Sequence, residues 1–187
     1  MSNKTKLYLD RYSLHKDLHN KLNLILANSL QESSLNSMST EHEKSVRELE
    51  IFALFVSLSP IAIVPGSAIK RTPPEPDLLC RTYENEIVAF ELVELCDPQI
   101  AEVFANPLIL ENTYIRTSDP SEFIIQKKLT RSYVTEHPVE LLCYTDGRIG
   151  TPPNVIIPTL QRRIIDARHN FRRAWLLSRK NVHKLWG

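Results

Sequence analysis

The stretch of sequence that decides the fold covers residues 76–94, PDLLCRTYENEIVAFELVE. Its segments LLCRTY and IVAF are typical of two short strands, and Glu84-Asn85 provides the turn between them. The predicted hairpin carries one carboxylate at its start, Asp77, and another near its end, Glu91. Carboxylates that face each other on neighbouring strands form an oxygen-only site suited to Mg²⁺.

Of these two acids, Glu91 is the harder to explain as a structural residue. Its strand, IVAFELVEL at 87–95, is otherwise almost wholly apolar, so we expect a central strand that is covered on both faces. A carboxylate in such a strand is costly to bury unless it is paired or bound to a metal. Asp77 has a simpler alternative role, because an Asp commonly closes a proline-rich turn and three prolines occur within 73–76.

The sequence before the hairpin predicts two helices. Apolar residues recur at helical spacing over residues 14–30, and a polar, Ser-rich loop follows. A capping-box pattern at Thr40 opens a second helix, which Pro60 ends. We therefore separate residues 1–40, a helix and a loop, from residues 41–187, within a chain whose length suits one compact domain.

The sequence after the hairpin alternates between helix and strand. The expected elements are a short helix at 98–105, a helix from Asp119-Pro120 to His137-Pro138, a strand at 139–145, a helix from Pro158 through Trp175 and an edge strand at 181–186. This order predicts an α/β fold with a mixed central β-sheet flanked by helices.

The Pro-Asp at the start of one strand, the Glu of the next strand and the helix and strand that follow resemble the PD-(D/E)XK nuclease superfamily. The resemblance extends over about residues 41–145 and rests on a short motif in the expected order of elements. It implies the restriction-endonuclease-like fold, with a three-layer core. It also implies that Asp77 and Glu91 bind Mg²⁺ or Mn²⁺ and that the chain hydrolyses phosphodiester bonds of nucleic acid, DNA above all.

The sequence departs from this family at one catalytic position. The lysine of the motif should stand two residues after Glu91, where this chain has Val93. In this superfamily the lysine sometimes migrates to the adjoining helix, and Gln126-Lys127-Lys128 lies on that helix. Lys128 borders the apolar stripe of the helix, so it is better placed than Lys127 to face inward. The alternative is that only the scaffold survives and the nuclease is inactive.

Many members of the superfamily also carry a glutamate on the helix before the hairpin. Glu48 and Glu50 both lie on that predicted helix, among apolar residues that do not separate them cleanly. We assign the supporting catalytic role to Glu48. A solvated charge on a helix is the alternative for either residue.

Basic residues gather at the C-terminal end of the chain, although the net charge is only +1. Between Gln161 and Gly187 a single acid, Asp166, accompanies eight of the 23 lysines and arginines. A one-sided basic face is the expected footprint for nucleic acid, and arginine forks suit phosphate oxygens. We therefore expect nucleic-acid contacts from residues on the predicted C-terminal helix, namely Arg163, Arg168, Arg172 and Arg173. A solvated cationic face is the alternative.

The remaining features set the context of the chain. The three cysteines lie far apart in apolar runs without a C-x-x-C pair, which argues against a zinc site or a disulfide framework. No secretory signal or membrane span is predicted, so we expect a soluble, cytoplasmic protein without a membrane partner. The sequence thus predicts a Mg²⁺-dependent nuclease, and it leaves self-association open. The rival hypotheses are an inactive module that binds nucleic acid or protein, and an accessory protein without chemistry.

Overall fold

The computed structural model describes residues 36–105 and 119–187. The chain divides into two units, Met1–His42 and Glu43–Gly187, and the fold below is that of the second unit. The helix predicted over residues 14–30 lies outside the described residues. The first described element, α2 (Asn36–Leu58), begins within the predicted Ser-rich loop and ends, as predicted, just before Pro60.

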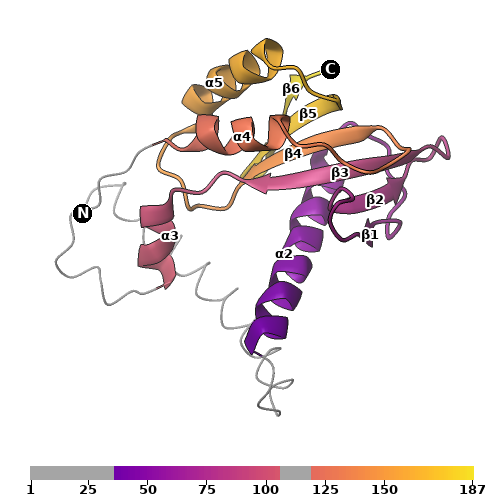
Figure 1. Ribbon diagram of the computed structural model, residues 1–187, viewed down its shortest axis with the longest axis horizontal. Coiled ribbons are helices and arrows are strands. Elements are labelled where there is room, and N and C mark those ends of the chain that lie inside the picture. Colours follow the sequence, from indigo (N-terminus) through magenta and orange to yellow (C-terminus); the bar gives the residue numbers. More distant parts are fainter. Residues whose placement is uncertain (1–35, 106–118) are drawn as a thin grey trace. The chain divides into compact units, whose positions relative to one another are not determined.

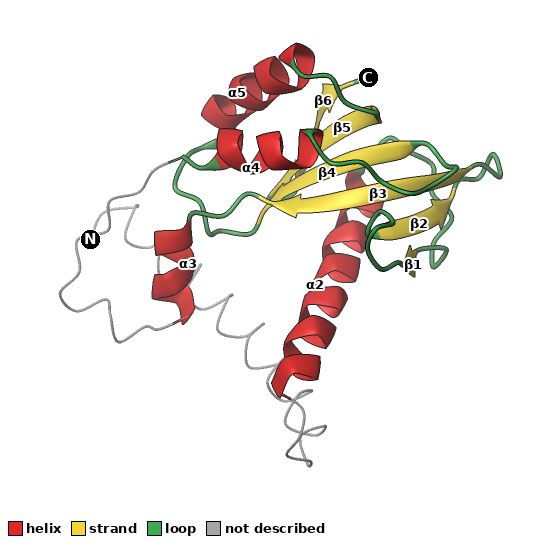
Figure 2. Cartoon of the chain, viewed as in Figure 1, coloured by secondary structure: helices red, strands yellow, loops and turns green. Residues whose placement is uncertain are grey.

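A six-stranded mixed sheet forms the centre of the second unit (Figures 1 and 2). The strands lie in the sheet in chain order, and their bounds are β1 (Ile69–Lys70), β2 (Leu78–Arg81), β3 (Ile87–Glu94), β4 (Val139–Thr145), β5 (Phe171–Ser178) and β6 (Asn181–Trp186). The first three pair antiparallel, β3, β4 and β5 run parallel, and β6 returns antiparallel to β5. The prediction of an α/β fold with a mixed sheet is confirmed.

The hairpin predicted from residues 76–94 is present as β2 and β3. Leu78 pairs with Phe90 and Arg81 with Ile87, so the two strands keep one register along their length. At the turn Asn85 adopts a positive φ of 65°, a conformation that asparagine tolerates better than most residues. The strand at 139–145 and the edge strand at 181–186 are also confirmed.

Helix α2 packs on one face of the sheet. The ring of Phe52 lies 4.9 Å from that of Phe90 on β3, and the ring of Phe55 lies 5.9 Å from that of Trp175 on β5. These rings are buried together with aliphatic side chains that β3, β4 and β5 direct to the same face. Burial of this aromatic layer fixes the helix against the sheet.

The helices α4 (Ser121–Leu129) and α5 (Pro153–Asp166) cover the other face (Figure 2). Ile125 of α4 and Leu160 of α5 are fully buried against Ala89 and Val93 of β3 and against side chains of β4 and β5. Helix α3 (Pro98–Ala105) follows β3 at the predicted position. The described part of the second unit therefore has three layers: helix α2, the sheet, and the helices α4 and α5.

Two predicted helices have other bounds. The helix expected from Pro158 through Trp175 is wrong: α5 begins at Pro153, ends at Asp166, and is followed by strand β5. The run FRRAWLLS of β5 has apolar residues at helical spacing, but it is a strand between β4 and β6, where its side chains enter both cores. The other helix, expected to reach His137-Pro138, already ends at Leu129 in α4.

Candidate active site

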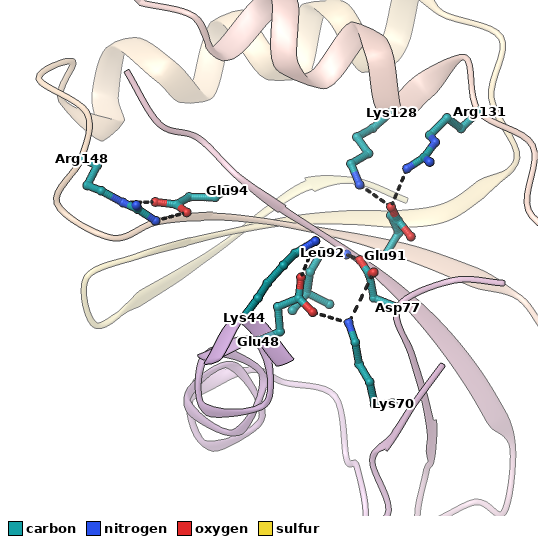
Figure 3. A network of polar contacts seen from close by, with 10 residues as sticks. All are labelled: Lys44, Glu48, Lys70, Asp77, Glu91, Leu92, Glu94, Lys128, Arg131 and Arg148. Atoms are coloured by element: carbon teal, nitrogen blue, oxygen red, sulfur yellow. Dashed lines mark hydrogen bonds and ion pairs between the residues drawn. The ribbon is translucent and has the colours of Figure 1, made fainter. Parts of the chain in front are cut away.

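The hairpin register brings Asp77 and Glu91 opposite each other. Since Leu78 pairs with Phe90 on antiparallel strands, the preceding residue, Asp77, stands across from Glu91 (Figure 3). The Asp77 carboxylate is fixed there, because its Oδ2 accepts the backbone N–H of Leu92 at 2.8 Å. The two acids that the sequence singled out thus meet at one place, where the antiparallel and parallel parts of the sheet join at β3.

Glu91 is a carboxylate buried within the sheet. Only 2% of its surface is exposed, and its Oε1 forms an ion pair with Nζ of Lys128 and lies 3.6 Å from Nη1 of Arg131. Burial raises the pKa of Glu91 and the negative charge of Asp77 raises it further, while the ammonium of Lys128 works in the opposite direction. The two carboxylates are therefore within electrostatic reach of each other.

Lys128 supplies a cation that β3 itself does not provide. It lies near the C-terminal end of α4, between the buried residues Ile125 and Leu129, and extends to Glu91 (Figure 3). Lys127 is exposed and lies over the ring of Phe123, with 4.2 Å from its Nζ to the ring centroid. Of the two lysines, Lys128, the one that borders the apolar stripe of the helix, therefore meets Glu91. Val93 is buried in the core between the sheet and α4–α5.

Tyr133 adds a polar group to this side of the site. Its hydroxyl is buried and has no hydrogen-bond partner among the described residues. The hydroxyl lies close enough to Glu91 for each group to shift the pKa of the other, yet the pair does not meet hydrogen-bond geometry. Burial raises the pKa of Tyr133, and the charge of Glu91 adds to this rise. The hydroxyl therefore remains protonated and able to donate.

Glu48 joins the site from helix α2 through a lysine that the sequence analysis did not select. Nζ of Lys70, on β1, forms an ion pair with Glu48 and lies 3.5 Å from Oδ1 of Asp77. Glu48 is buried, and it also lies 4.0 Å from Nζ of Lys44. The available signal for Lys70 was weak, because a two-residue edge strand before a proline-rich segment leaves little pattern to follow.

The environment of Lys70 keeps it positively charged. Burial works to lower its pKa, but the hydrogen bond to Glu48 and the negative charge of Asp77 outweigh this effect and raise the pKa. The site thus alternates in sign, with Lys70 between Glu48 and Asp77 and Lys128 beside Glu91 (Figure 3).

The oxygen donors of this arrangement suit Mg²⁺ better than a metal that needs many protein ligands. Among the described residues, no three His, Cys, Asp or Glu side chains gather closely enough to form a metal centre of their own. Mg²⁺ is commonly held by one or two carboxylates, with waters and substrate phosphates completing its shell. The pair of Asp77 and Glu91 fits that mode of binding.

The four arginines predicted to contact nucleic acid do not share one helix. Arg163 lies on α5 and pairs with Glu122 of α4, and Arg168 follows α5. Arg172 and Arg173 lie on β5, because the predicted helix ends at Asp166. Of the four, Arg168 alone makes no ion pair within the described residues.

Arg172 and Arg173 converge on a buried acid, Glu140 of β4. A register shift after Val139 leaves Arg172 as an extra residue opposite β4, so both arginines meet the same carboxylate. Glu140 is fully buried and accepts hydrogen bonds from Nη2 of Arg172 at 2.8 Å and from Nε1 of Trp175 at 2.7 Å. Arg172 and Arg173 therefore satisfy an internal charge, which the sequence analysis missed because nothing local marks Glu140 as paired.

No family model matches the chain, and neither does any curated protein. In the described part of the chain, none of the helices combines the length and the apolar character needed to cross a membrane. Function therefore has to be inferred from the geometry around Asp77 and Glu91.

Proposed function

We propose that this chain is a Mg²⁺-dependent nuclease that hydrolyses phosphodiester bonds, with DNA as the first substrate to test. One observation carries the proposal. Two carboxylates, Asp77 and Glu91, stand opposite each other across the hairpin, and the ammonium of Lys128 from α4 contacts Glu91. Paired acids with a nearby cation are the parts that metal-assisted phosphodiester hydrolysis requires.

The order of the elements supports the same proposal. The described elements run in the order helix α2, three strands, the helices α3 and α4, and the parallel strand β4. Asp77 stands directly before the second strand and Glu91 lies within the third. Apart from the additional helix α3, this is the order that the PD-(D/E)XK resemblance implies. The position of the family lysine is taken by buried Val93, and Lys128 reaches Glu91 from α4 instead. A lysine that has migrated to the helix accounts for both facts.

Each residue of the site has a task in this mechanism. Asp77 and Glu91 would hold Mg²⁺, with Glu48 in support from α2. Bound Mg²⁺ would neutralise charge on the scissile phosphate and lower the pKa of the attacking water. Lys128 would stabilise negative charge that develops on the phosphate or orient the water. The buried hydroxyl of Tyr133 lies near Glu91, as Lys128 does, and would be available there as a hydrogen-bond donor.

The test is cleavage by the purified chain of single-stranded, duplex and supercoiled DNA, with Mg²⁺ or Mn²⁺ and with EDTA as the blank. Divalent-dependent cleavage that disappears in Asp77→Ala supports the proposal. Calorimetry with Mn²⁺ on both proteins separates loss of metal binding from loss of fold. A chain that binds no divalent ion and cleaves none of the three substrates would be a non-catalytic module, the second candidate, which the aliphatic Val93 favours.

A further inference from the structure

Two hollows, both lined by Arg131, lie at the surface of the second unit. The larger, of about 370 Å³, lies between the C-terminal ends of α4 and α5 and residue Trp186 of β6. The smaller, of about 170 Å³, continues along the segment that leads into β4. Arg131 and Asn170 line both, so the hollows adjoin at these two residues, and the pair of hollows is called the groove below. Of the elements that carry it, α5 lies beside both α4 and β6 (Figure 1).

The groove is basic. Arg131 and Arg168 line it, and none of the residues that line either hollow is acidic. Arg168 is exposed and makes no ion pair within the described residues, whereas Arg163, Arg172 and Arg173 are all paired with glutamates. Arg131 lies 3.6 Å from Glu91, so Arg168 is the groove arginine without an ion pair among the described residues, and a guanidinium of this kind beside a concave surface attracts phosphate oxygens.

An aromatic side chain stands at the same groove. Trp186 is 39% exposed, and its ring lies 5.7 Å from that of His169 at an interplanar angle of 85°. Nδ1 of His169 accepts the backbone N–H of Phe171, so the proton is on Nε2, which donates to the carbonyl of Ile164. These two hydrogen bonds hold His169 in place beside the indole, and a partly exposed indole offers a stacking surface to a nucleobase.

Arg131 connects the groove to the candidate active site. It lines both hollows, and its Nη1 lies 3.6 Å from Oε1 of Glu91. A chain of phosphates that follows the groove would therefore pass Arg131 directly beside the acids proposed to hold Mg²⁺.

We propose that this groove binds a single strand of nucleic acid, with phosphates on Arg168 and Arg131 and an unpaired base on the indole of Trp186. The inference rests on the proposed function only for cleavage of the strand, which the groove leads to Glu91. Binding of the strand in the groove does not depend on cleavage. Unpaired bases are needed because a base within a duplex has no free face for stacking. An acidic peptide would satisfy the arginines and leave the indole unused.

Binding is measured on the full chain in EDTA, where no cleavage occurs, by fluorescence anisotropy of a short labelled single-stranded DNA. Arg168→Gln should weaken binding about tenfold and reduce the slope of log affinity against log salt by about 0.7, the loss of one single-strand phosphate contact. Trp186→Leu should weaken binding by about 5- to 100-fold, and Trp186→Phe should restore most of it, because stacking tolerates any aromatic ring. Arg162→Gln, an exposed arginine of α5 that lines neither hollow, is the matched control and should bind like the parent.

The competitors identify the ligand. Unlabelled single strand should displace the probe far better than a duplex of the same sequence, inorganic phosphate or a polyglutamate peptide. Equal displacement by the peptide would replace the nucleic-acid assignment with an acidic-protein one, and equal displacement by phosphate would reduce the site to an anion site. Unchanged affinity in both Arg168→Gln and Trp186→Leu, with folds confirmed by circular dichroism, overturns the inference, as does a parent chain that binds no oligonucleotide.

Cleavage assays separate this inference from the proposed function. If the groove variants lose binding in EDTA while the parent never cleaves DNA with Mg²⁺, the groove stands and the nuclease proposal fails. If the parent cleaves and the groove variants cleave equally well at low substrate concentration, the nuclease stands and the groove does not guide the strand.

Discussion

Lys128 extends from helix α4 to the carboxylate of Glu91, which lies in the middle of the central strand β3. The contact joins two residues that are 37 positions apart in the chain. It supplies a positive charge at a point where the strand offers only Val93, and Val93 is needed in the hydrophobic core. A site that lacks its cation within the strand can thus obtain it from the layer above.

Replacing Lys128 with Met should lower kcat for DNA cleavage by about 10²–10³-fold, because the charge that stabilises the reacting phosphate is lost. Steady-state cleavage with saturating Mg²⁺ measures the effect. Lys127→Met is the matched control, since Lys127 is the neighbouring lysine and lies over Phe123 on the exposed side. Equal losses in the two variants would contradict a specific role for Lys128.

Glu91→Gln should abolish divalent-dependent cleavage while leaving the fold intact. The amide preserves the shape of the side chain but loses the charge that binds a hard cation. Cleavage and far-UV circular dichroism are measured together, with Glu94→Gln as control, because Glu94 pairs with Arg148 at the end of the same strand. Full cleavage by Glu91→Gln would move the site elsewhere.

Lys70→Met should lower the stability of the metal-free protein and enlarge the gain in stability that a divalent ion gives. Without Lys70, the buried acid Glu48 loses its closest cation, at a cost of about 1–3 kcal/mol. The same change leaves Glu48 and Asp77 free to attract a divalent ion, so the rise in Tm on adding Mn²⁺ should be larger than in the parent. Lys44→Met, at a mostly exposed lysine 4.0 Å from Glu48, should change neither quantity. A Mn²⁺-induced rise that is the same in parent and Lys70→Met would show that Lys70 does not compete with metal.

Glu140→Ala should destabilise the fold by about 3–5 kcal/mol in urea denaturation, because it leaves Arg172 and the indole N–H of Trp175 without their buried partner. Glu136→Ala, at an exposed position shortly before β4, should be nearly neutral. Arg172→Gln should likewise lower stability and leave the affinity for DNA unchanged. A loss of DNA affinity without a loss of stability would return Arg172 to the nucleic-acid interface.

Thiol labelling of the native protein should modify Cys96 first. Burial raises the pKa of Cys80 and of Cys143 to about 12, so almost no thiolate is present at neutral pH, and both side chains are buried. Cys96 is half-buried and its pKa is raised less. Mass spectrometry after a short exposure to iodoacetamide, with and without urea, checks this order. Early labelling of Cys143 in the absence of urea would mean that the sheet core opens readily.

The sequence was most informative where local pattern and tertiary environment agree. The alternation of strand and turn residues in 76–94 predicted the hairpin, and the isolated acid of β3 predicted that Glu91 would need a partner. The helical spacing around Lys128 predicted which lysine faces the sheet. These signals depend on neighbours within a few residues, and such neighbours are visible in a single chain.

The errors occurred where long-range pairing overrides local pattern. The segment FRRAWLLS has apolar residues that suit either a helix or a central strand, and its pairing with β4 and β6 decides the outcome. The role of Arg172 depends on Glu140, 32 residues earlier and buried. Lys70 is positioned by Glu48, 22 residues before it. No spacing rule connects such partners before the fold is known.

The attachment of Lys128 to a helix determines how mutations elsewhere in the core would affect the site. A lysine on β3 would be fixed by the hydrogen bonds of the sheet, but the position of Lys128 depends on how α4 rests on the residues beneath Ile125 and Leu129. A small loss of volume in that layer would tilt or slide the helix before it unfolded the domain. Conservative changes far from any carboxylate would therefore separate Lys128 from Glu91 while the protein still folds.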